Sequence, residues 1–148
     1  MKAGRPHNVY LSQQALDILA AFKTCFGASS HLHPGRYETK LPISAATLNR
    51  VIDATVKFIR ESGEDFEPFT VHDLRRTAST VLHEVGFNSD WIEKCLAHEQ
   101  RGVRAIYNKA EYAEQRRTML QTWADMLEGW FQSGGNVVPI RNQAAALA

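Results

Sequence analysis

The sequence predicts a mainly α-helical, compact domain that carries the remnant of a small β-hairpin at its N-terminus. Apolar residues recur at helical spacing through most of the chain, and these segments start after Ser or Asn and stop near Gly. The 148 residues suffice for one domain with a hydrophobic core. Residues 8–11, "NVYL", follow a turn that contains Gly4 and Pro6, and they form the expected second arm of the hairpin.

Capping residues predict where the first two helices begin. Ser12 is a good N-cap for a helix over residues 13–26, and Ser44 is a good N-cap for a helix over residues 45–62. Each helix is expected to stop at the glycine that follows it, and a loop rich in Gly, Pro and Ser joins the two. The residues expected to face a core are Leu16, Leu19, Ala20 and Phe26 in the first helix and Leu48, Val51, Ile52, Thr55 and Ile59 in the second.

Four more helical segments follow. A helix over residues 71–85 closes at a glycine, and "NSD" caps a short helix over residues 91–98. Residues 103–107 are a candidate for a further short helix, and residues 111–131 are expected to form a long amphipathic one. The apolar residues assigned to the core are Leu74, Ala78, Val81, Leu82, Val85, Trp91, Met119, Leu120, Trp123, Met126, Leu127 and Trp130. We expect residues 1–133 to form one domain and residues 134–148 to form a tail.

Composition narrows the classes of function. A net charge of +1 does not by itself indicate a nucleic-acid partner, although residues 101–117 hold five basic and two acidic side chains. Cys25 and Cys95 lie far apart in sequence, which suggests neither a disulfide framework nor a metal motif and fits a reducing compartment. The chain shows no signal peptide and no apolar run that could span a bilayer, so a cytoplasmic protein is expected.

The most informative stretch is "VHDLRRTAST", residues 71–80. His72 and Arg75 are three positions apart, so they share one flank of the helix, away from its apolar side. Both lie in the first turn, where free backbone N–H groups also favour an anion. Arginine offers a planar fork matched to phosphate or carboxylate, and histidine adds a donor that moves protons near neutrality. The pair predicts a phosphate site, and the alternative is a solvated basic helix face.

Downstream spacing favours the phosphate site. His98 follows Arg75 by 23 residues, and Tyr107 follows His98 by nine. The segments "HDLRRT", "LAH" and "AIYNKA" resemble, in order and separation, the catalytic boxes of the tyrosine recombinases, the phage integrase family. "RPHNVYLS", "HLHPGR" and "WADML" resemble the prophage and genomic-island integrase branch of that family. The resemblance covers essentially the whole chain and implies a C-terminal catalytic domain.

The resemblance implies a role for each matching residue. Tyr107 matches the nucleophile, and Arg75 matches the second of two arginines that grip the scissile phosphate. His72 matches the box residue beside that arginine, and His98 matches the histidine that hydrogen-bonds the phosphate. Lys2 falls where the family carries a hairpin lysine that protonates the leaving 5′-oxygen. The family's first arginine lies upstream of this hairpin, so the chain is expected to be truncated at its N-terminal side and inactive alone.

Further basic residues are assigned to DNA. Arg76 is expected to contact the phosphate backbone or to form a structural ion pair, and His7 is expected to contact DNA beside the hairpin. Arg5 and Arg104 complete the expected DNA-binding set. The partners that the resemblance implies are double-stranded attachment sites, a homotetramer on DNA and accessory DNA-bending proteins.

The residues are consistent with metal-free phosphoryl transfer. Tyrosine has a pKa near 10 and is a weak nucleophile unless nearby charge is stabilised, which an arginine and histidines around the phosphate would provide. No cluster of acids and histidines at metal spacing is visible, so neither two-metal chemistry nor a cofactor is expected. The implied reaction cuts and rejoins DNA through a 3′-phosphotyrosine, for integration or excision of a mobile element.

Alternatives remain open at this point. Tyr107 could be a core aromatic residue, and Tyr112 is the rival nucleophile. His31 and His33 could ligate a metal, but they lack a third partner. The stretch "FNSDWIEKCLAH" faintly mimics a helix-turn-helix, so a non-catalytic helical DNA-binding module is the alternative function. A type IB topoisomerase would share the chemistry, with a weaker resemblance.

Overall fold

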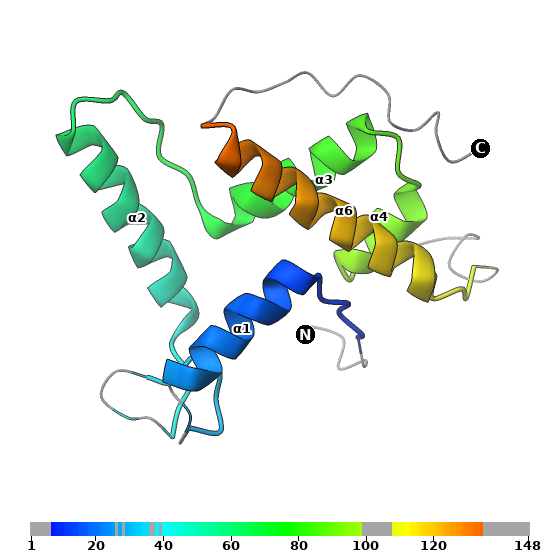
Figure 1. Ribbon diagram of the computed structural model, residues 1–148, viewed down its shortest axis with the longest axis horizontal. Coiled ribbons are helices and arrows are strands. Elements are labelled where there is room, and N and C mark those ends of the chain that lie inside the picture. The colour runs from blue at the N-terminus through cyan, green and yellow to red at the C-terminus, as the bar shows by residue number, and fades with distance from the viewer. Residues whose placement is uncertain are drawn as a thin grey trace. The chain divides into compact units, whose positions relative to one another are not determined.

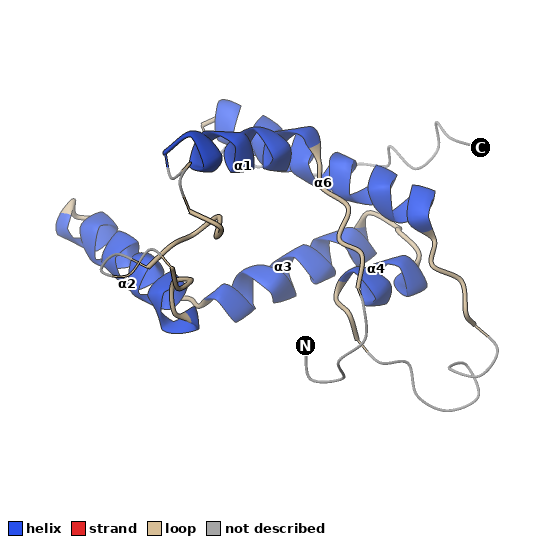
Figure 2. Ribbon diagram, turned by 90° about the horizontal axis from the view of Figure 1, so that it is seen from below, coloured by secondary structure: helices blue, strands red, loops and turns tan. Residues whose placement is uncertain are grey.

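The computed structural model describes residues 7–25, 27, 29–35, 38, 40–98 and 108–134. These residues form helices joined by loops, which confirms the mainly α-helical prediction (Figures 1 and 2). The helices are α1 (Gln13–Cys25), α2 (Ala45–Glu61), α3 (Val71–Glu84), α4 (Ser89–Cys95) and α6 (Ala113–Gln132).

The strand prediction at the N-terminus is not confirmed. Residues 8–11 adopt neither helix nor strand, and residues 1–6, which would hold the predicted turn, lie outside the described part. Within the described residues the β-pairing consists of an isolated bridge between Pro34 and Pro42. A short apolar segment such as "NVYL" satisfies a strand pattern locally, but a strand also needs a partner that the local sequence does not specify.

The predicted helix caps are largely confirmed. The Ser12 hydroxyl accepts a hydrogen bond from the Ala15 N–H at 3.2 Å, as an N-cap should. Ser44 occupies the N-cap position of α2, but its hydroxyl bonds the Thr47 hydroxyl at 3.1 Å instead of a backbone N–H.

A Schellman motif ends α3 at the predicted glycine. Gly86 has φ +90°, a conformation that glycine adopts without steric cost. Its N–H donates to the His83 carbonyl at 3.0 Å, and the Phe87 N–H donates to the Leu82 carbonyl at 3.1 Å. Phe87 then packs against the core cluster that contains Leu82, so the motif also directs the chain toward α4.

The chain divides into two compact units, and the division falls inside α1 and α3. One unit comprises residues 17–78, and the other comprises residues 1–16 together with 79–148. In the unit of residues 17–78, α2 buries Val56 and the Asn49 side chain accepts a hydrogen bond from the Val71 N–H at 3.2 Å. This bond ties the start of α3 to α2.

Several residues assigned to the core are exposed in the structure. Leu48 and Val51 on α2 have 46% and 59% of their surface exposed, and Leu74 on α3 has 53%. The buried face of α2 centres instead on Val56, which is four positions beyond Ile52. Helical periodicity identifies an apolar face, but how much of that face is covered depends on its neighbours.

The second unit has its core where α3, α4 and α6 meet. Leu82, Ile92 and Met119, one from each helix, are all at most 5% exposed. Around them pack the partly buried Phe87, Trp91, Cys95, Leu96 and Trp123. Both views show α4 lying beside α6 (Figures 1 and 2). The assignment of Trp91 and Trp123 to a core is therefore confirmed.

Helix α6 also holds the segment that leads into α1. The Gln121 side-chain oxygen accepts a hydrogen bond from the Gln13 N–H at 2.9 Å, so a side chain of α6 caps the first turn of α1. The Gln121 amide group donates to the Gln14 side chain at 2.8 Å, and Gln14 donates to Asp125 at 2.8 Å. These polar contacts fix residues 13 and 14 against α6.

Met119→Ala tests the core. We expect it to lower the free energy of unfolding by about 2–5 kcal/mol, because removing a buried side chain loses transfer energy and leaves a cavity. Leu127→Ala is the matched control, since Leu127 lies on the same helix and is 45% exposed, and we expect it to cost less than about 1 kcal/mol. Urea denaturation followed by tryptophan fluorescence measures both, and equal losses would contradict the assigned core.

Candidate active site

A capping box fixes the first turn of α3, which carries the predicted phosphate-binding pair. The Thr70 N–H and hydroxyl both donate to Asp73 Oδ2, at 3.0 and 2.8 Å. In return the Asp73 N–H donates to the Thr70 hydroxyl at 3.3 Å. These reciprocal bonds satisfy donors that the helix start would otherwise leave unpaired, so the backbone under His72 and Arg75 is well defined.

His72 and Arg75 lie in the first two turns of this 14-residue helix, and both are exposed. Their spacing places them on neighbouring positions of the helix surface, as the sequence predicts. Arg76 forms an ion pair with Asp73 at 3.0 Å, which is the structural contact named as one of its two expected roles. The first two turns of α3 therefore present His72 and Arg75 to solvent, beside the Asp73 carboxylate that pairs with Arg76.

The pKa of Asp73 lies below its ordinary value of 3.8. The side-chain hydrogen bond from Thr70 is the largest cause, followed by the backbone hydrogen bond from the same residue. Electrostatic interactions with Arg76 and then His72 lower the pKa of Asp73 further, while desolvation opposes the shift. The capping box is thus strongest with Asp73 ionised.

A second Schellman motif positions His98. The Ala97 N–H donates to the Lys94 carbonyl and the His98 N–H donates to the Glu93 carbonyl, both at 3.1 Å. Ala97 occupies the left-handed position with φ +52°, where a glycine is usual, and an alanine there carries a steric cost of about 1–2 kcal/mol. The "LAH" segment is therefore a helix-terminating turn whose last residue is the predicted histidine.

The ring of His98 is held by Glu93. His98 Nδ1 lies 2.7 Å from Glu93 Oε2, and because a carboxylate only accepts, Nδ1–H is the donor. Nε2 remains as the ring atom for another ligand, on a side chain that is half exposed. Sequence reasoning missed Glu93. An acidic residue five positions before a histidine at a helix end is a signal that could have indicated this contact.

The remaining predicted catalytic residues, Tyr107 and Lys2, lie outside the described residues, as do Arg5 and Arg104. His7 is described and half-buried. His72 and Arg75 belong to one compact unit and His98 to the other. The convergence of the five predicted catalytic residues on one phosphate therefore stays a prediction.

The residue after Tyr107 is anchored by its side chain. Asn108 donates through Nδ2 to Asp90 at 3.1 Å, and its Oδ1 accepts from the Ala110 N–H at 3.3 Å and from the Tyr112 hydroxyl at 3.2 Å. Tyr112, the rival nucleophile, thus uses its hydroxyl in a structural hydrogen bond and is half-buried. The Tyr112 hydroxyl therefore has a structural hydrogen-bond partner, while Tyr107 as the nucleophile stays a prediction.

The basic strip of residues 101–117 is smaller than its composition suggests. Arg116 is fully buried and so is withdrawn from any surface that a polyanion could reach. Arg117 forms an ion pair with Glu114 at 3.1 Å. Counting charges along the sequence cannot distinguish a buried arginine from one in a solvated strip.

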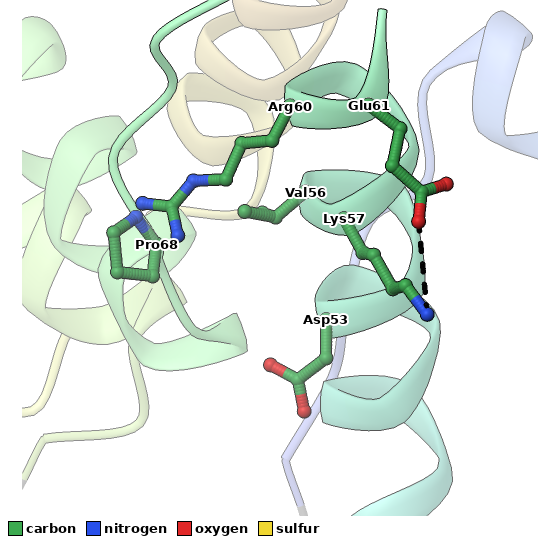
Figure 3. A pocket seen from close by; sticks show the side chains of 6 residues that line it. All are labelled: Asp53, Val56, Lys57, Arg60, Glu61 and Pro68. Atoms are coloured by element: carbon green, nitrogen blue, oxygen red, sulfur yellow. Dashed lines mark ion pairs between the residues drawn. The ribbon is translucent and has the colours of Figure 1, made fainter.

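No group of side chains suited to a metal ion is found among the residues that the structure describes. They contain no group of three or more His, Cys, Asp or Glu side chains that could hold a metal ion, and His33 packs edge-on against Phe22 at 4.6 Å. A shallow pocket of about 410 Å³ lies along α2, where Lys57 and Glu61 form an ion pair (Figure 3). It is lined by none of the predicted site residues.

No described helix combines the length and apolar character needed to cross a membrane.

Comparison with known proteins identifies the family. The model of the phage integrase family matches residues 1–114. The chain belongs to the phage integrase family. Prophage integrase IntZ of Escherichia coli strain K12 is 40% identical over 138 residues, which cover 92% of this chain and 32% of that protein. Prophage integrase IntA of the same strain is 40% identical over 86% of this chain and 29% of its own length.

A phage relative gives the same result. The integrase of Shigella phage Sf6 is 35% identical over 130 residues, which cover 86% of this chain and 32% of that integrase. The chain thus spans about a third of the length of these integrase relatives. No solved structure gives a significant match.

Asp73→Asn tests the capping box through its pH dependence. Because folding lowers the pKa of Asp73, its ionised form stabilises the fold above pH 3.8, and this contribution is lost as the pH falls below that value. We expect wild type to be more stable than Asp73→Asn at neutral pH and the difference to shrink below pH 3.8. The urea midpoints of the two proteins, measured at neutral pH and below pH 3.8, test this expectation. A stability difference of the same size at both would contradict it.

Proposed function

We propose that this chain is the catalytic segment of a site-specific tyrosine recombinase that integrates or excises a mobile DNA element. The observation that carries the proposal is the presence of His72, Arg75, His98 and Tyr107, in the order and separations of the integrase boxes, in a chain of that family. The relatives of similar sequence bear the names of prophage and phage integrases.

Arg75 and His72 bind the scissile phosphate. The guanidinium of Arg75 is a planar fork that matches two phosphate oxygens, and it stays charged at any working pH. The capping box between Thr70 and Asp73 supports this role, since it holds the backbone of the first turn before DNA arrives. A preformed turn lowers the ordering cost of binding the phosphate.

His98 adds a ligand to the same phosphate. Its Nδ1–H donates to Glu93, so Nε2 is the atom that meets a phosphate oxygen, and it donates when the ring is protonated. Glu93 acts as a positioning residue, because it fixes the orientation of the ring without touching the DNA.

The covalent step is a transesterification. The phenol oxygen of Tyr107 attacks the phosphorus and forms the new O–P bond, while the bond from phosphorus to the 5′-oxygen breaks. The Lys2 ammonium gives a proton to the leaving 5′-oxygen, and the phenol proton passes to water or to a neutral histidine of the site. The 3′-phosphotyrosine keeps the phosphodiester energy, so attack by a 5′-hydroxyl rejoins DNA without ATP.

The whole protein would act on double-stranded attachment sites as a tetramer, with accessory DNA-bending proteins. Residues 1–133 supply the catalytic segment, and residues 134–148 dock on a neighbouring copy. Arg5, His7, Arg76 and Arg104 contact the DNA backbone, where basic side chains position a protein without reading sequence.

Tyr107→Phe tests the nucleophile. In the full-length protein we expect it to abolish the covalent protein–DNA adduct and to leave DNA binding intact, because only the attacking oxygen is removed. The substrate is a nicked duplex that carries the junction at which the mobile element is inserted, and denaturing gels without magnesium detect the adduct. Tyr112→Phe is the matched control and should retain it.

Two outcomes would contradict this assignment. Loss of the adduct in Tyr112→Phe with its retention in Tyr107→Phe would make Tyr112 the nucleophile. A wild-type protein that gives only a salt-sensitive gel shift and no adduct would be a non-catalytic DNA-binding module.

Arg75→Ala and Arg76→Ala test the phosphate pair. We expect Arg75→Ala to slow cleavage by roughly 10²-fold or more, since it removes a charged donor to the transition state. Arg76→Ala should slow cleavage by less than about tenfold, because Arg76 pairs with Asp73. Single-turnover cleavage measures both rates, and equal losses would refute the assignment of Arg75 as the phosphate ligand.

A further inference from the structure

The charged side chain of Arg116, in the first turn of α6, is completely buried. Arginine is almost never fully buried unless it is paired, because removing a charge from water costs several kcal/mol. Burial also rules out a contact between Arg116 and DNA in this fold. The hydrogen bonds of its guanidinium therefore indicate the structural role of this buried charge.

The guanidinium bridges two distant segments of the chain. Nη2 donates to the Asn8 carbonyl at 2.6 Å, and Nη1 donates to the Glu111 carbonyl at 3.2 Å. Nη1 also lies 3.6 Å from the Glu111 carboxylate, which balances the charge. Tyr10 covers the group, with its ring centroid 5.0 Å from the guanidinium carbon. Nε makes no hydrogen bond to any described residue.

These two carbonyls lie close in sequence to the two groups that the proposed reaction must bring together. Asn8 is six residues after Lys2, and Glu111 is four residues after Tyr107. The two nitrogens of one rigid plane hold both carbonyls, so the fork sets the spacing between the segments. A lysine cannot do this, because its single ammonium has no fixed geometry.

Each segment has a second anchor of its own. Asn108 fixes the chain directly after Tyr107 through bonds to Asp90 and to the residues that lead into α6. On the other side, Gln121 of α6 caps the Gln13 N–H. The fork of Arg116 is a direct link between the carbonyls of Asn8 and Glu111 in these two segments.

We propose that Arg116 is a positioning residue for DNA cleavage, because it holds the carbonyl of Asn8, which follows Lys2 in the sequence, at a fixed distance from the carbonyl of Glu111, which follows Tyr107. This inference rests on the proposed function. It assigns a role in DNA cleavage to a residue that touches neither the DNA nor the reacting atoms. Its effect on catalysis comes from proximity, which a small misplacement is enough to lose.

Arg116→Lys in the full-length protein tests the proposal, with Arg117→Lys as the matched control. Arg117 also lies over Tyr10, at 5.3 Å, but it is exposed and pairs with Glu114. We expect Arg116→Lys to slow cleavage of ordinary DNA by roughly tenfold or more with DNA binding unchanged. Arg117→Lys should leave the rate within about twofold of wild type.

A second substrate distinguishes a misplaced general acid from a nonspecific loss of cleavage activity. A duplex with sulfur in place of the bridging 5′-oxygen releases a thiolate, which leaves without taking a proton from Lys2. On this substrate we expect Arg116→Lys to cleave within about threefold of wild type, because the misplaced acid is no longer needed. In a Lys2→Ala background, Arg116→Lys should cause little further loss on ordinary DNA.

Equal slowing on both substrates, or no slowing on ordinary DNA, would overturn the proposal. If Arg116→Lys does not fold, as judged by its unfolding transition, Arg116→Gln gives the same test, since a neutral amide leaves no unpaired buried charge and cannot hold both carbonyls. Failure of the proposed function is a separate result: the wild-type protein would then form no adduct at Tyr107 on either substrate.

Discussion

The contact between Leu82, Ile92 and Met119 joins α3, α4 and α6 into one core, and much of the described structure depends on it. Each helix contributes one fully or almost fully buried apolar side chain, and aromatic residues close around them. The hydrophobic free energy of that burial holds α6 in place, so that its polar side chains can act on other segments. Arg116 and Gln121 of this helix make the hydrogen bonds that reach residues 8, 13 and 14.

The predicted site residues share a physical arrangement. Each predicted catalytic residue that the structure describes lies on backbone or has a ring held by a neighbour with no part in the proposed chemistry: Asp73 fixes the turn under His72 and Arg75, and Glu93 fixes the ring of His98. Two left-handed residues, Ala97 and Tyr112, lie next to these segments. Their backbone strain is tolerated because hydrogen bonds on both sides hold them, and such strain is common beside functional groups.

The sequence predicted the helices well because local rules govern them. Serine and asparagine caps, terminal glycines and apolar periodicity located α1 to α4 and α6 to within a few residues. It predicted burial less well: Leu48, Val51 and Leu74 are exposed although they lie on apolar faces. Periodicity reports which side of a helix is apolar, whereas coverage is decided by residues far away in the chain.

By itself the sequence determined the family, the order and spacing of the predicted catalytic residues and the helical class, since all three follow from residue identity and separation along the chain. Only the tertiary structure decided that Arg116 is buried instead of lying in a basic strip, that Tyr112 uses its hydroxyl structurally and that Glu93 holds His98. These contacts depend on distances between side chains, and the contact of Arg116 with Asn8 joins positions more than 100 residues apart. No local pattern encodes such a contact, because it exists only after the core has formed.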